Sequence, residues 1–273
     1  MTSAAHGTAE IATLCKHLKL PTVGREAQRL AEEARRQGIT HLKFMAQLLM
    51  AELREREERR AARRIKEAGF PRIKTLEGFD FAKAPQLPEA RIRELSTGTY
   101  IARAEPILFL GEPGTGKTHL ATALGVAAAK DGRSVRFTTA GRLVTELVEA
   151  KDAHQLGRIA GRLARVDVLI LDEFGYLPFS RNDAELLFQV LSERQEQKPL
   201  ILTTNLPFGE WTSIFSDPRL CRAVVDRITH KAHIIETGSK SIRLEEAIAR
   251  TKRNGPSGTK NSTTKKERES DRS

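Results

Sequence analysis

Eight consecutive residues constrain the fold of this chain more than any others. They match the pattern G-x-x-x-x-G-K-[ST] and are Gly111-Glu112-Pro113-Gly114-Thr115-Gly116-Lys117-Thr118. The glycines can adopt backbone angles that turn amide N–H groups inward around phosphates, and a following helix adds the partial positive charge of its N-terminus. Lys117 would then reach the β- and γ-phosphates of ATP, and the Thr118 hydroxyl would bind Mg²⁺. The pattern therefore predicts an ATP-binding loop.

The sequence on both sides of this loop agrees with that prediction. The apolar stretch Ile107–Leu110 predicts a short strand before the loop, and Lys117–Lys130 predicts a helix directly after it. Predicted strands then alternate with predicted helices as far as the strand His233–Glu236. Such alternation is typical of a parallel α/β sheet with helices on both faces. Residues 99–250 are therefore predicted to form an ATPase domain around five strands.

Two further predicted strands lead into polar residues. Val168–Leu171 is followed by Asp172 and Glu173, and Leu200–Thr203 leads to Asn205. In a parallel sheet the carboxyl ends of strands face the ligand crevice, so these side chains should lie near the phosphates. We expect Asp172 to hold Mg²⁺, directly or through water, and Glu173 to polarise the attacking water. The Asn205 amide can bond the γ-phosphate or that water.

The first part of the chain is predicted to be a separate helical domain. Apolar residues recur at three- and four-residue steps through residues 9–68, with breaks expected at Pro21 and Gly24 and again at 38–40. Residues 69–98 are expected to be an ordered linker with a short helix. Within the N-terminal domain, 1–68, a run of basic residues predicts a contact with DNA or an acidic protein through Arg60, Arg63 and Arg64. Residues 251–273 are predicted to be a disordered basic tail.

Charge and cysteine content limit the functional classes. The formal net charge is +11, which favours a polyanionic partner such as nucleic acid because Lys and Arg displace counterions from phosphates. Cys15 and Cys221 stand far apart and outside any metal-binding pattern, so we expect reduced thiols. There is no predicted signal peptide and no apolar run long enough to cross a bilayer. A cytoplasmic protein without membrane contact is expected.

The motifs together resemble a known family. An ATP-binding loop, an Asp-Glu pair and a strand-terminal Asn occur in this order in AAA+ ATPases. The stretches Leu110–Leu120, Asp172–Pro178, Thr203–Pro207 and Val225–His230, with the linker segment Thr75–Phe81, look like IstB. IstB proteins are the ATPase helpers of bacterial insertion-sequence transposases. The resemblance covers residues 10–247, and helicase loaders of the DnaC type and the replication initiator DnaA are related.

The resemblance implies an AAA+ P-loop NTPase in which ATP lies between neighbouring copies of an oligomer. It implies that His119 belongs to the nucleotide-binding stretch. It further implies that an arginine of the adjacent copy completes each site, for which Arg227 is the first candidate, with Arg222 and Arg243 as alternatives. In this clade a helical segment after the second strand lines the DNA channel. Here that segment is 141–165, and its cations are Arg142, Lys151, Arg158, Arg162 and Arg165.

Three functional hypotheses follow. The first is a regulator of transposition that binds ATP, oligomerises on duplex DNA with little sequence preference, selects or remodels the target, and recruits and stimulates a partner transposase. The second is a helicase loader that contacts a replicative helicase through residues 1–68 and binds single strands. The third is an ATP-dependent protein remodeller without a nucleic-acid role, which the charge of +11 disfavours.

Overall fold

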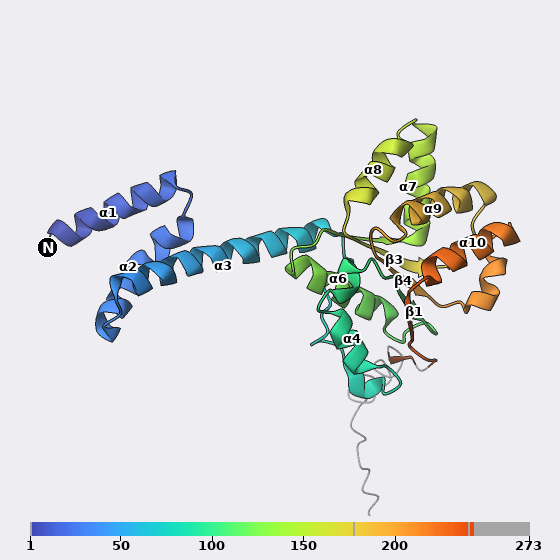
Figure 1. Cartoon of the computed structure of the whole chain (residues 1–273), viewed down its shortest axis with the longest axis horizontal. Coiled ribbons are helices and arrows are strands. Elements are labelled where there is room, and N and C mark those ends of the chain that lie inside the picture. Colours follow the sequence, from blue (N-terminus) through green and yellow to red (C-terminus); the bar gives the residue numbers. More distant parts are fainter. Residues whose placement is uncertain (1, 177, 240, 243–273) are drawn as a thin grey trace, which may run out of the picture.

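The computed structural model describes residues 2–176, 178–239 and 241–242 (Figure 1). The predictions made for Arg243 and for residues 251–273 lie outside them. The described chain forms a helical N-terminal unit and an α/β domain, and one long helix runs from the first toward the second. Among the described helices, none combines the length and the apolar character that crossing a membrane requires.

Five parallel strands form a single sheet in the spatial order β2-β3-β4-β1-β5. They are β1 (Ile107–Leu110), β2 (Val135–Thr139), β3 (Val168–Phe174), β4 (Leu200–Thr204) and β5 (His233–Glu236). The predicted five-stranded parallel sheet is thereby confirmed. The predicted end of β3 at Leu171 is wrong, because the strand continues through Asp172 to Phe174. A register shift after Leu171 accommodates Glu173, whose φ is 56°.

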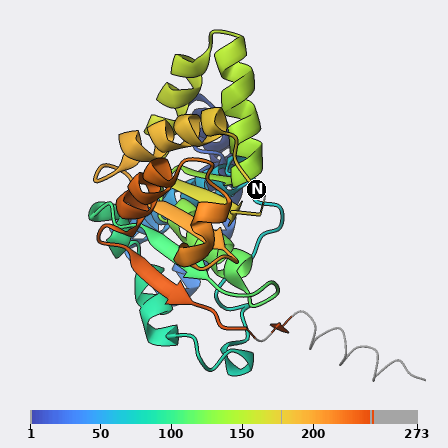
Figure 2. The ribbon, with the colours of Figure 1, turned by 90° about the vertical axis from the view of Figure 1, so that its right-hand side faces the viewer.

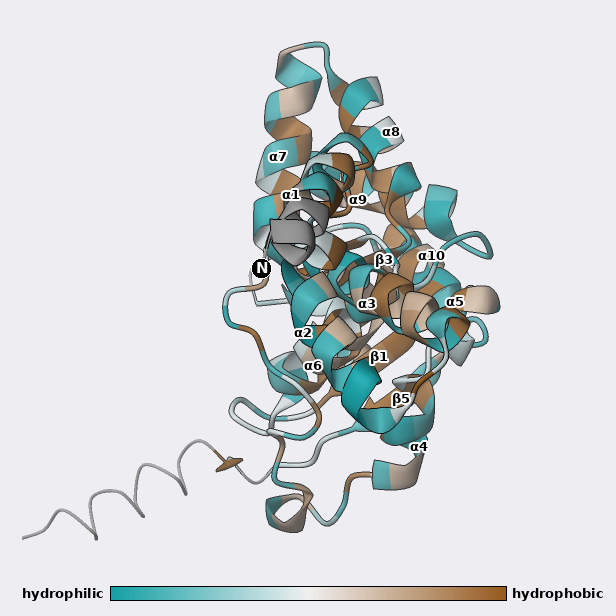
Figure 3. Ribbon diagram, turned by 90° about the vertical axis from the view of Figure 1, so that its left-hand side faces the viewer, coloured by the Kyte–Doolittle hydropathy of each residue, from teal (hydrophilic) through white to brown (hydrophobic). Residues whose placement is uncertain are grey.

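Helices cover both faces of the sheet, and side chains of the strands contribute to an apolar core on each face. On one face lie α6 (Lys117–Lys130) and two shorter helices, α4 (Glu89–Leu95) and α5 (Thr99–Ala102). On the other lie α7 (Ala140–Asp152), α8 (Leu156–Arg165), α9 (Arg181–Arg194) and α10 (Pro218–Thr229). Along β1, Ile107 and Phe109 enter the first core while Leu108 and Leu110 enter the second. The hydropathy colouring shows this pattern as brown strands beneath helices with teal outer faces (Figure 3).

The second core is organised around one aromatic side chain. Trp211, on the short 3₁₀ segment η2 (Phe208–Ser213), is fully buried, and its Nε1 donates to Leu206 O at 3.1 Å. Its ring packs against Phe174 with 4.6 Å between centroids. Because Phe174 directly follows the Asp-Glu pair on β3, this packing fixes the end of the strand that carries both acids.

Helices α7 and α8 project from the sheet as a pair (Figure 2). The base of the pair is held by Arg194, whose side chain is only 3% exposed. Its guanidinium donates to Leu163 O at 2.7 Å, Val166 O at 3.1 Å and Pro199 O at 3.1 Å. Burial lowers the pKa of this guanidinium to about 10. The contact ties the end of α8 to the starts of β3 and β4.

The N-terminal unit consists of three helices: α1 (Thr2–His17), α2 (Pro21–Gln37) and α3 (His41–Glu67). Pro21 occupies the first turn of α2, where its missing N–H has no intrahelical partner to lose. Gly38 ends α2 in the left-handed conformation, with φ of 64°. The predicted break at Gly24 is wrong, because α2 runs through it. A Cβ at position 24 would lie 3.3 Å from the Cys15 Cβ, so this glycine lets α1 approach α2 closely.

The end of α3 packs against α6 and β2 of the α/β domain. The chain then stays on that domain, with Phe137 N donating to Ala68 O at 2.8 Å. Beyond it, the segment that the sequence marks as a linker contributes buried side chains to the first core, among them Leu76, Phe79 and Leu87. This segment therefore lies against the sheet and its covering helices.

Candidate ATP-binding site

The glycine-rich loop joins β1 to α6 at the carboxyl edge of the sheet. Gly111 has φ of 147° and lies so close to the segment after β5 that a Cβ there would clash with Thr237 and Gly238. That segment also holds the loop directly. Thr115 Oγ1 and Thr237 Oγ1 are 2.6 Å apart, and Glu112 N donates to Gly238 O at 3.0 Å. The loop is thus braced from β5, a neighbour of β1 that is distant in the sequence.

Lys117 begins α6 and is largely buried, with 9% exposure. Its ammonium donates to Gly111 O at 2.5 Å and to Glu112 O at 2.8 Å, so it lies within the curve of its own loop. The first N–H groups of a helix have no intrahelical acceptor, and those of α6 begin at this position. The loop therefore gathers an ammonium and a helix N-terminus around one space, which suits a polyphosphate.

The segment between the N-terminal unit and β1 covers this loop, which the sequence-based interpretation did not specify. His119 Nε2 lies 2.9 Å from Thr75 O, and the His119 ring meets the Phe79 ring edge-on at 5.0 Å. A Cβ on Gly116 would approach Phe79 Cε2 to 2.6 Å, so only glycine admits this ring. The aromatic pair Phe79 and Phe81 in an otherwise polar segment was the available signal.

Asp172 and Thr118 meet next to the loop. Asp172 is 5% exposed, and its Oδ1 accepts hydrogen bonds from Thr118 Oγ1 at 2.9 Å and from Thr203 Oγ1 at 2.5 Å. A carboxylate and a hydroxyl at this distance form the all-oxygen donor set that Mg²⁺ prefers, so the residues present fit that ion. Thr203 was missed as a site residue because a threonine within an apolar strand is also an ordinary strand former.

Glu173 differs from Asp172 in its exposure to solvent and in its backbone conformation. Its side chain is exposed, while Asp172 and Phe174 on either side are buried. Its backbone has a left-handed φ of 56°, and its N–H donates to Thr203 Oγ1 at 3.1 Å. A non-glycine residue held in this conformation is a strained feature that the surrounding structure must maintain. The strand thus aims one carboxylate inward and leaves the next facing solvent.

Asn205 follows β4 directly and is half-buried. Gly111 N donates to Thr204 O at 3.3 Å, which joins the start of the loop to the residue before Asn205. The structure therefore brings the loop, the acid pair and Asn205 to the same edge of the sheet. That juxtaposition is what the three strand ends predicted.

Arg227 lies at the opposite edge. Its guanidinium donates to Gln195 Oε1 and sits 4.9 Å above the Phe188 ring. It lines a cavity of about 200 Å³ together with Pro106 and Leu200, which stand at the amino ends of β1 and β4. Arg222, on the same helix, is exposed. Arg227 is therefore separated from the glycine-rich loop of its own chain by the length of the strands.

The predicted DNA contacts fall on two separate parts of the molecule. Those of the α7–α8 pair are all exposed and are Arg142, Lys151, Arg158, Arg162 and Arg165. Two of them have protein partners, because Arg162 pairs with Glu146 and Lys151 donates to Asn182. On α3, Arg60 is exposed, Arg63 pairs with Glu67 at 3.6 Å, and Arg64 is half-buried.

The histidines at the end of α10 and in β5, His230 and His233, make polar contacts with protein side chains. His233 lies between Glu105, at 2.8 Å from its Nε2, and Arg91, at 2.8 Å from its Nδ1. His230 pairs with Glu196 at 3.4 Å. Within residues 2–176, 178–239 and 241–242, no three His, Cys, Asp or Glu side chains gather as a metal-binding group.

Comparisons with known proteins identify the family to which the chain is similar. The family model described as IstB-like ATP binding protein matches residues 13–249. A Geobacillus stearothermophilus protein named for ATP binding in insertion sequence IS5376 is 41% identical over 85% of this chain and 92% of its own length. A Pseudomonas aeruginosa protein named for ATP binding in insertion sequence IS21 is 38% identical over 87% of this chain and 89% of its own length.

Among solved structures, AMPPCP-bound DnaA from Aquifex aeolicus superimposes with a TM-score of 0.53. The match covers 70% of this chain and 57% of that one at 22% identity, so it bears on the fold alone. The expected AAA+ architecture is confirmed, and the chain belongs to the family of IstB-like ATP-binding proteins.

Proposed function

We propose that this protein is a DNA-stimulated, Mg²⁺-dependent ATPase that regulates transposition. It oligomerises on duplex DNA when ATP is bound, selects or remodels the target, and recruits and stimulates a partner transposase. The observation that carries the proposal is the meeting of Lys117, Thr118 and Asp172 beside the glycine-rich loop. Relatives named as ATP-binding proteins of insertion sequences favour transposition over helicase loading.

The residues at the carboxyl edge of the sheet have separate roles in binding phosphate, holding Mg²⁺ and activating water. The ammonium of Lys117 exchanges its loop carbonyls for the β- and γ-phosphates, and the N-terminus of α6 faces the same charge. Thr118 and Asp172 hold Mg²⁺, which when bound neutralises charge on the phosphate oxygens. The exposed carboxylate of Glu173 orients and polarises the attacking water. Asn205 donates its amide to that water or to the γ-phosphate.

A second copy of the protein supplies an arginine, Arg227, to each ATP site. Because Arg227 lies at the amino edge of the sheet, it is too far from its own loop to neutralise charge there. In an oligomer that stacks the amino edge of one copy on the carboxyl edge of the next, Arg227 enters the neighbouring site. An arginine acting in this way is a recurrent device of phosphoryl transfer. DNA that aligns several copies raises their local concentration and thereby stimulates hydrolysis.

Mixing two inactive variants tests this arrangement. Lys117→Ala removes the phosphate-binding ammonium and Arg227→Ala removes the trans cation, so each alone should turn over ATP at a few per cent of wild type or less. Mixed on duplex DNA, they form junctions that pair an intact loop with an intact arginine, and activity should return. The measurement is phosphate release against mixing ratio.

The controls separate the possible failures. Arg222→Ala in place of Arg227→Ala distinguishes the two arginines of α10. Gel filtration and binding of a fluorescent ATP analogue establish that the Arg227 variant is folded. If both variants still assemble on DNA and no ratio restores activity, Arg227 does not act in trans.

A further inference from the structure

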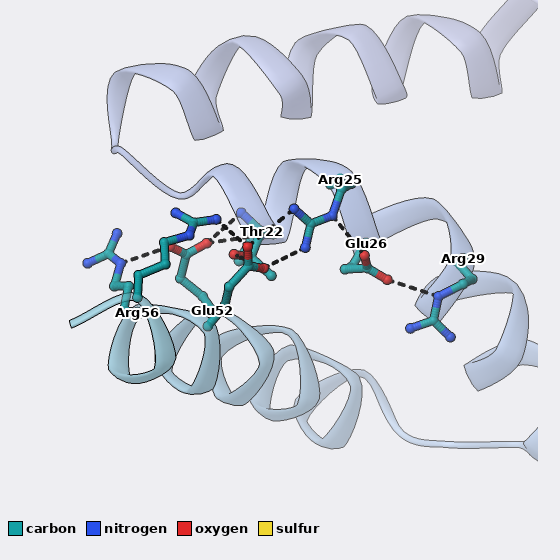
Figure 4. A network of polar contacts seen from close by, with 9 residues as sticks. Thr22, Arg25, Glu26, Arg29, Glu52 and Arg56 are labelled. Atoms are coloured by element: carbon teal, nitrogen blue, oxygen red, sulfur yellow. Dashed lines mark hydrogen bonds and ion pairs between the residues drawn. The ribbon is translucent and has the colours of Figure 1, made fainter. Parts of the chain in front are cut away.

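The N-terminal unit has two charged faces, and they differ in how their cations are paired. On one face, arginines of α2 are paired with carboxylates, and Figure 4 shows Arg25, Glu26 and Arg29 of this face together with Glu52 and Arg56. Arg25 bonds Glu26 and Glu55, and Arg29 bonds Glu26 at 2.9 Å and Glu33 at 3.4 Å. The hydrogen bonds from Arg25 hold the pKa of Glu55 at about 2, so the Arg25–Glu55 pair stays charged down to strongly acid pH. This face is electrostatically satisfied.

Next to this face, and sharing Arg59 with it, α1, the start of α2 and α3 enclose a groove of about 720 Å³. Five cations line it, namely Lys16, Lys19, Arg56, Arg59 and Arg60. Lys16, Lys19 and Arg60 are exposed and form no ion pair with any residue in the described part of the chain. The lining contains one acid, Glu52, which is 3% exposed and pairs with Arg56 at 2.8 Å. The groove therefore carries a clear excess of positive charge.

The walls of this groove are held in place by the protein itself. Glu52 Oε2 accepts from Thr22 N at 2.8 Å and Val23 N at 3.1 Å, so α3 caps the start of α2 (Figure 4). Arg56 bonds Glu52 and also donates to Lys19 O in the turn between α1 and α2. That turn requires a left-handed residue, since Lys19 has φ of 56°. These hydrogen bonds join the backbone segments that carry the groove cations without any contribution from a ligand.

We propose that this groove binds the phosphodiester backbone of duplex DNA, separately from the ATP-binding edge. The inference rests on the proposed function in that it takes DNA as the partner, and it adds where in the N-terminal unit the backbone is held. Three unpartnered cations, Lys16 on α1, Lys19 in the turn after it and Arg60 on α3, match a polyanion with regularly spaced charges. Each phosphate contact releases condensed counterions. The adjoining paired face has a smaller excess of positive charge, because its arginines Arg25 and Arg29 are paired with carboxylates.

The proposal also separates the three basic residues of α3 that the sequence singled out, because only one of them lines the groove. Arg60 faces the groove, whereas Arg63 pairs with Glu67 and Arg64 is half-buried near Gly132 at the end of α6. The sequence-based set of three arginines therefore contains one groove residue and two that face elsewhere. In their place the groove adds Lys16 near the end of α1 and Lys19 in the turn that follows it.

A matched pair of variants tests the proposal in the full-length protein. Lys16→Gln with Arg60→Gln removes two groove cations, and Arg25→Gln with Arg29→Gln removes two from the paired face, so both double variants lose two positive charges. Binding to a fluorescent duplex of arbitrary sequence is titrated from 0.05 to 1 M salt with a saturating non-hydrolysable ATP analogue.

The groove variant should bind duplex DNA at least about tenfold more weakly than wild type at about 0.1 M salt. The slope of the logarithm of its binding constant against the logarithm of salt concentration should be smaller in magnitude by about 1.8, or about 0.9 for each lost phosphate contact. The paired-face variant should keep a slope near that of wild type. Equal slopes for the two variants would overturn the proposal. Labelled polyglutamate that binds wild type and is lost in the groove variant, with duplex binding kept, would overturn it in favour of an acidic protein.

Failure of the groove is distinguishable from failure of the proposed function. If wild type binds no duplex at any salt concentration, DNA is not the partner and both proposals fall. If wild type binds and both variants bind equally, only the groove is wrong. ATP-analogue affinity and circular dichroism of each variant establish that the charges, and not the fold, were changed.

Discussion

The ATPase domain and the N-terminal unit are held together by different forces. In the ATPase domain large apolar side chains fill two buried cores, and Phe109, Phe174 and Trp211 are fully buried. In the N-terminal unit Leu42 is 85% exposed and Leu18 is 67% exposed, while a carboxylate, Glu52, is among the most deeply buried groups. Apolar burial stabilises the first region, and a polar network sets the geometry of the second.

This contrast matches the work proposed for each region. Phosphoryl transfer requires groups fixed to within fractions of an ångström, which a packed core provides. A surface that holds a DNA backbone needs charge in roughly the right place and tolerates more movement. The unit with the smaller apolar core should also open locally at lower free energy.

The largest expected effect lies at the ATPase edge. Glu173→Gln keeps size and polarity but cannot polarise water, so turnover should fall by about 10²–10⁴-fold while ATP binding persists. Phosphate release and binding of an ATP analogue measure the two. The groove variant should keep its DNA-independent turnover, which confines the chemistry to one region. Wild-type turnover in Glu173→Gln would remove this residue from the mechanism.

An intermediate effect is expected in the N-terminal unit. Glu52→Ala leaves the Thr22 and Val23 amides without an acceptor, which costs about 1–3 kcal/mol of local stability. Hydrogen exchange should accelerate across α2 and stay unchanged in the sheet. Glu33→Ala is the control, because its pair with Arg29 is exposed and worth roughly 0–0.5 kcal/mol. Equal acceleration in both variants would mean that the buried network has no special role.

The smallest effect is a pH dependence confined to the same helix. Burial alone would raise the pKa of Glu52, but hydrogen bonds from Arg56, Val23 and Thr22 outweigh it and lower that pKa. A depressed folded-state pKa adds stability above the unfolded value of about 4.3, and that stability is lost as pH falls through the folded value. Exchange of α2, corrected for intrinsic rates, should therefore rise below about pH 4. Glu52→Gln should flatten that rise.

The parts of the structure that were predictable share one property. Apolar strands ending in polar residues carry both the fold and the site in a few consecutive positions, so Lys117, Asp172 and Glu173 could be placed by reading along the chain. The features that were missed depend on contacts between distant segments. Thr203 reaches Asp172 from the next strand, and the Phe79 ring of the linker meets Gly116 of the glycine-rich loop.

Charged residues show the same limit. Glu52 and Arg56 stand four residues apart on α3, a spacing that suits an ion pair, and the pair forms at 2.8 Å. Nothing local indicated that this carboxylate would be buried against the start of another helix. Arg194 has an ordinary sequence context for an exposed helix end, yet it is buried among carbonyls from three segments. Burial of a charge is decided by tertiary packing, which a run of residues does not encode.

Helix α3 acts mechanically as a lever. It has 27 residues and so extends over roughly 40 Å, with its last turns against α6, the helix that starts at the glycine-rich loop. A tilt of about 5° at that base moves the far end by roughly 3 Å, comparable with the rise of two helical residues. Any tilt of α3 at its contact with α6 would therefore be amplified at the far end of the helical unit.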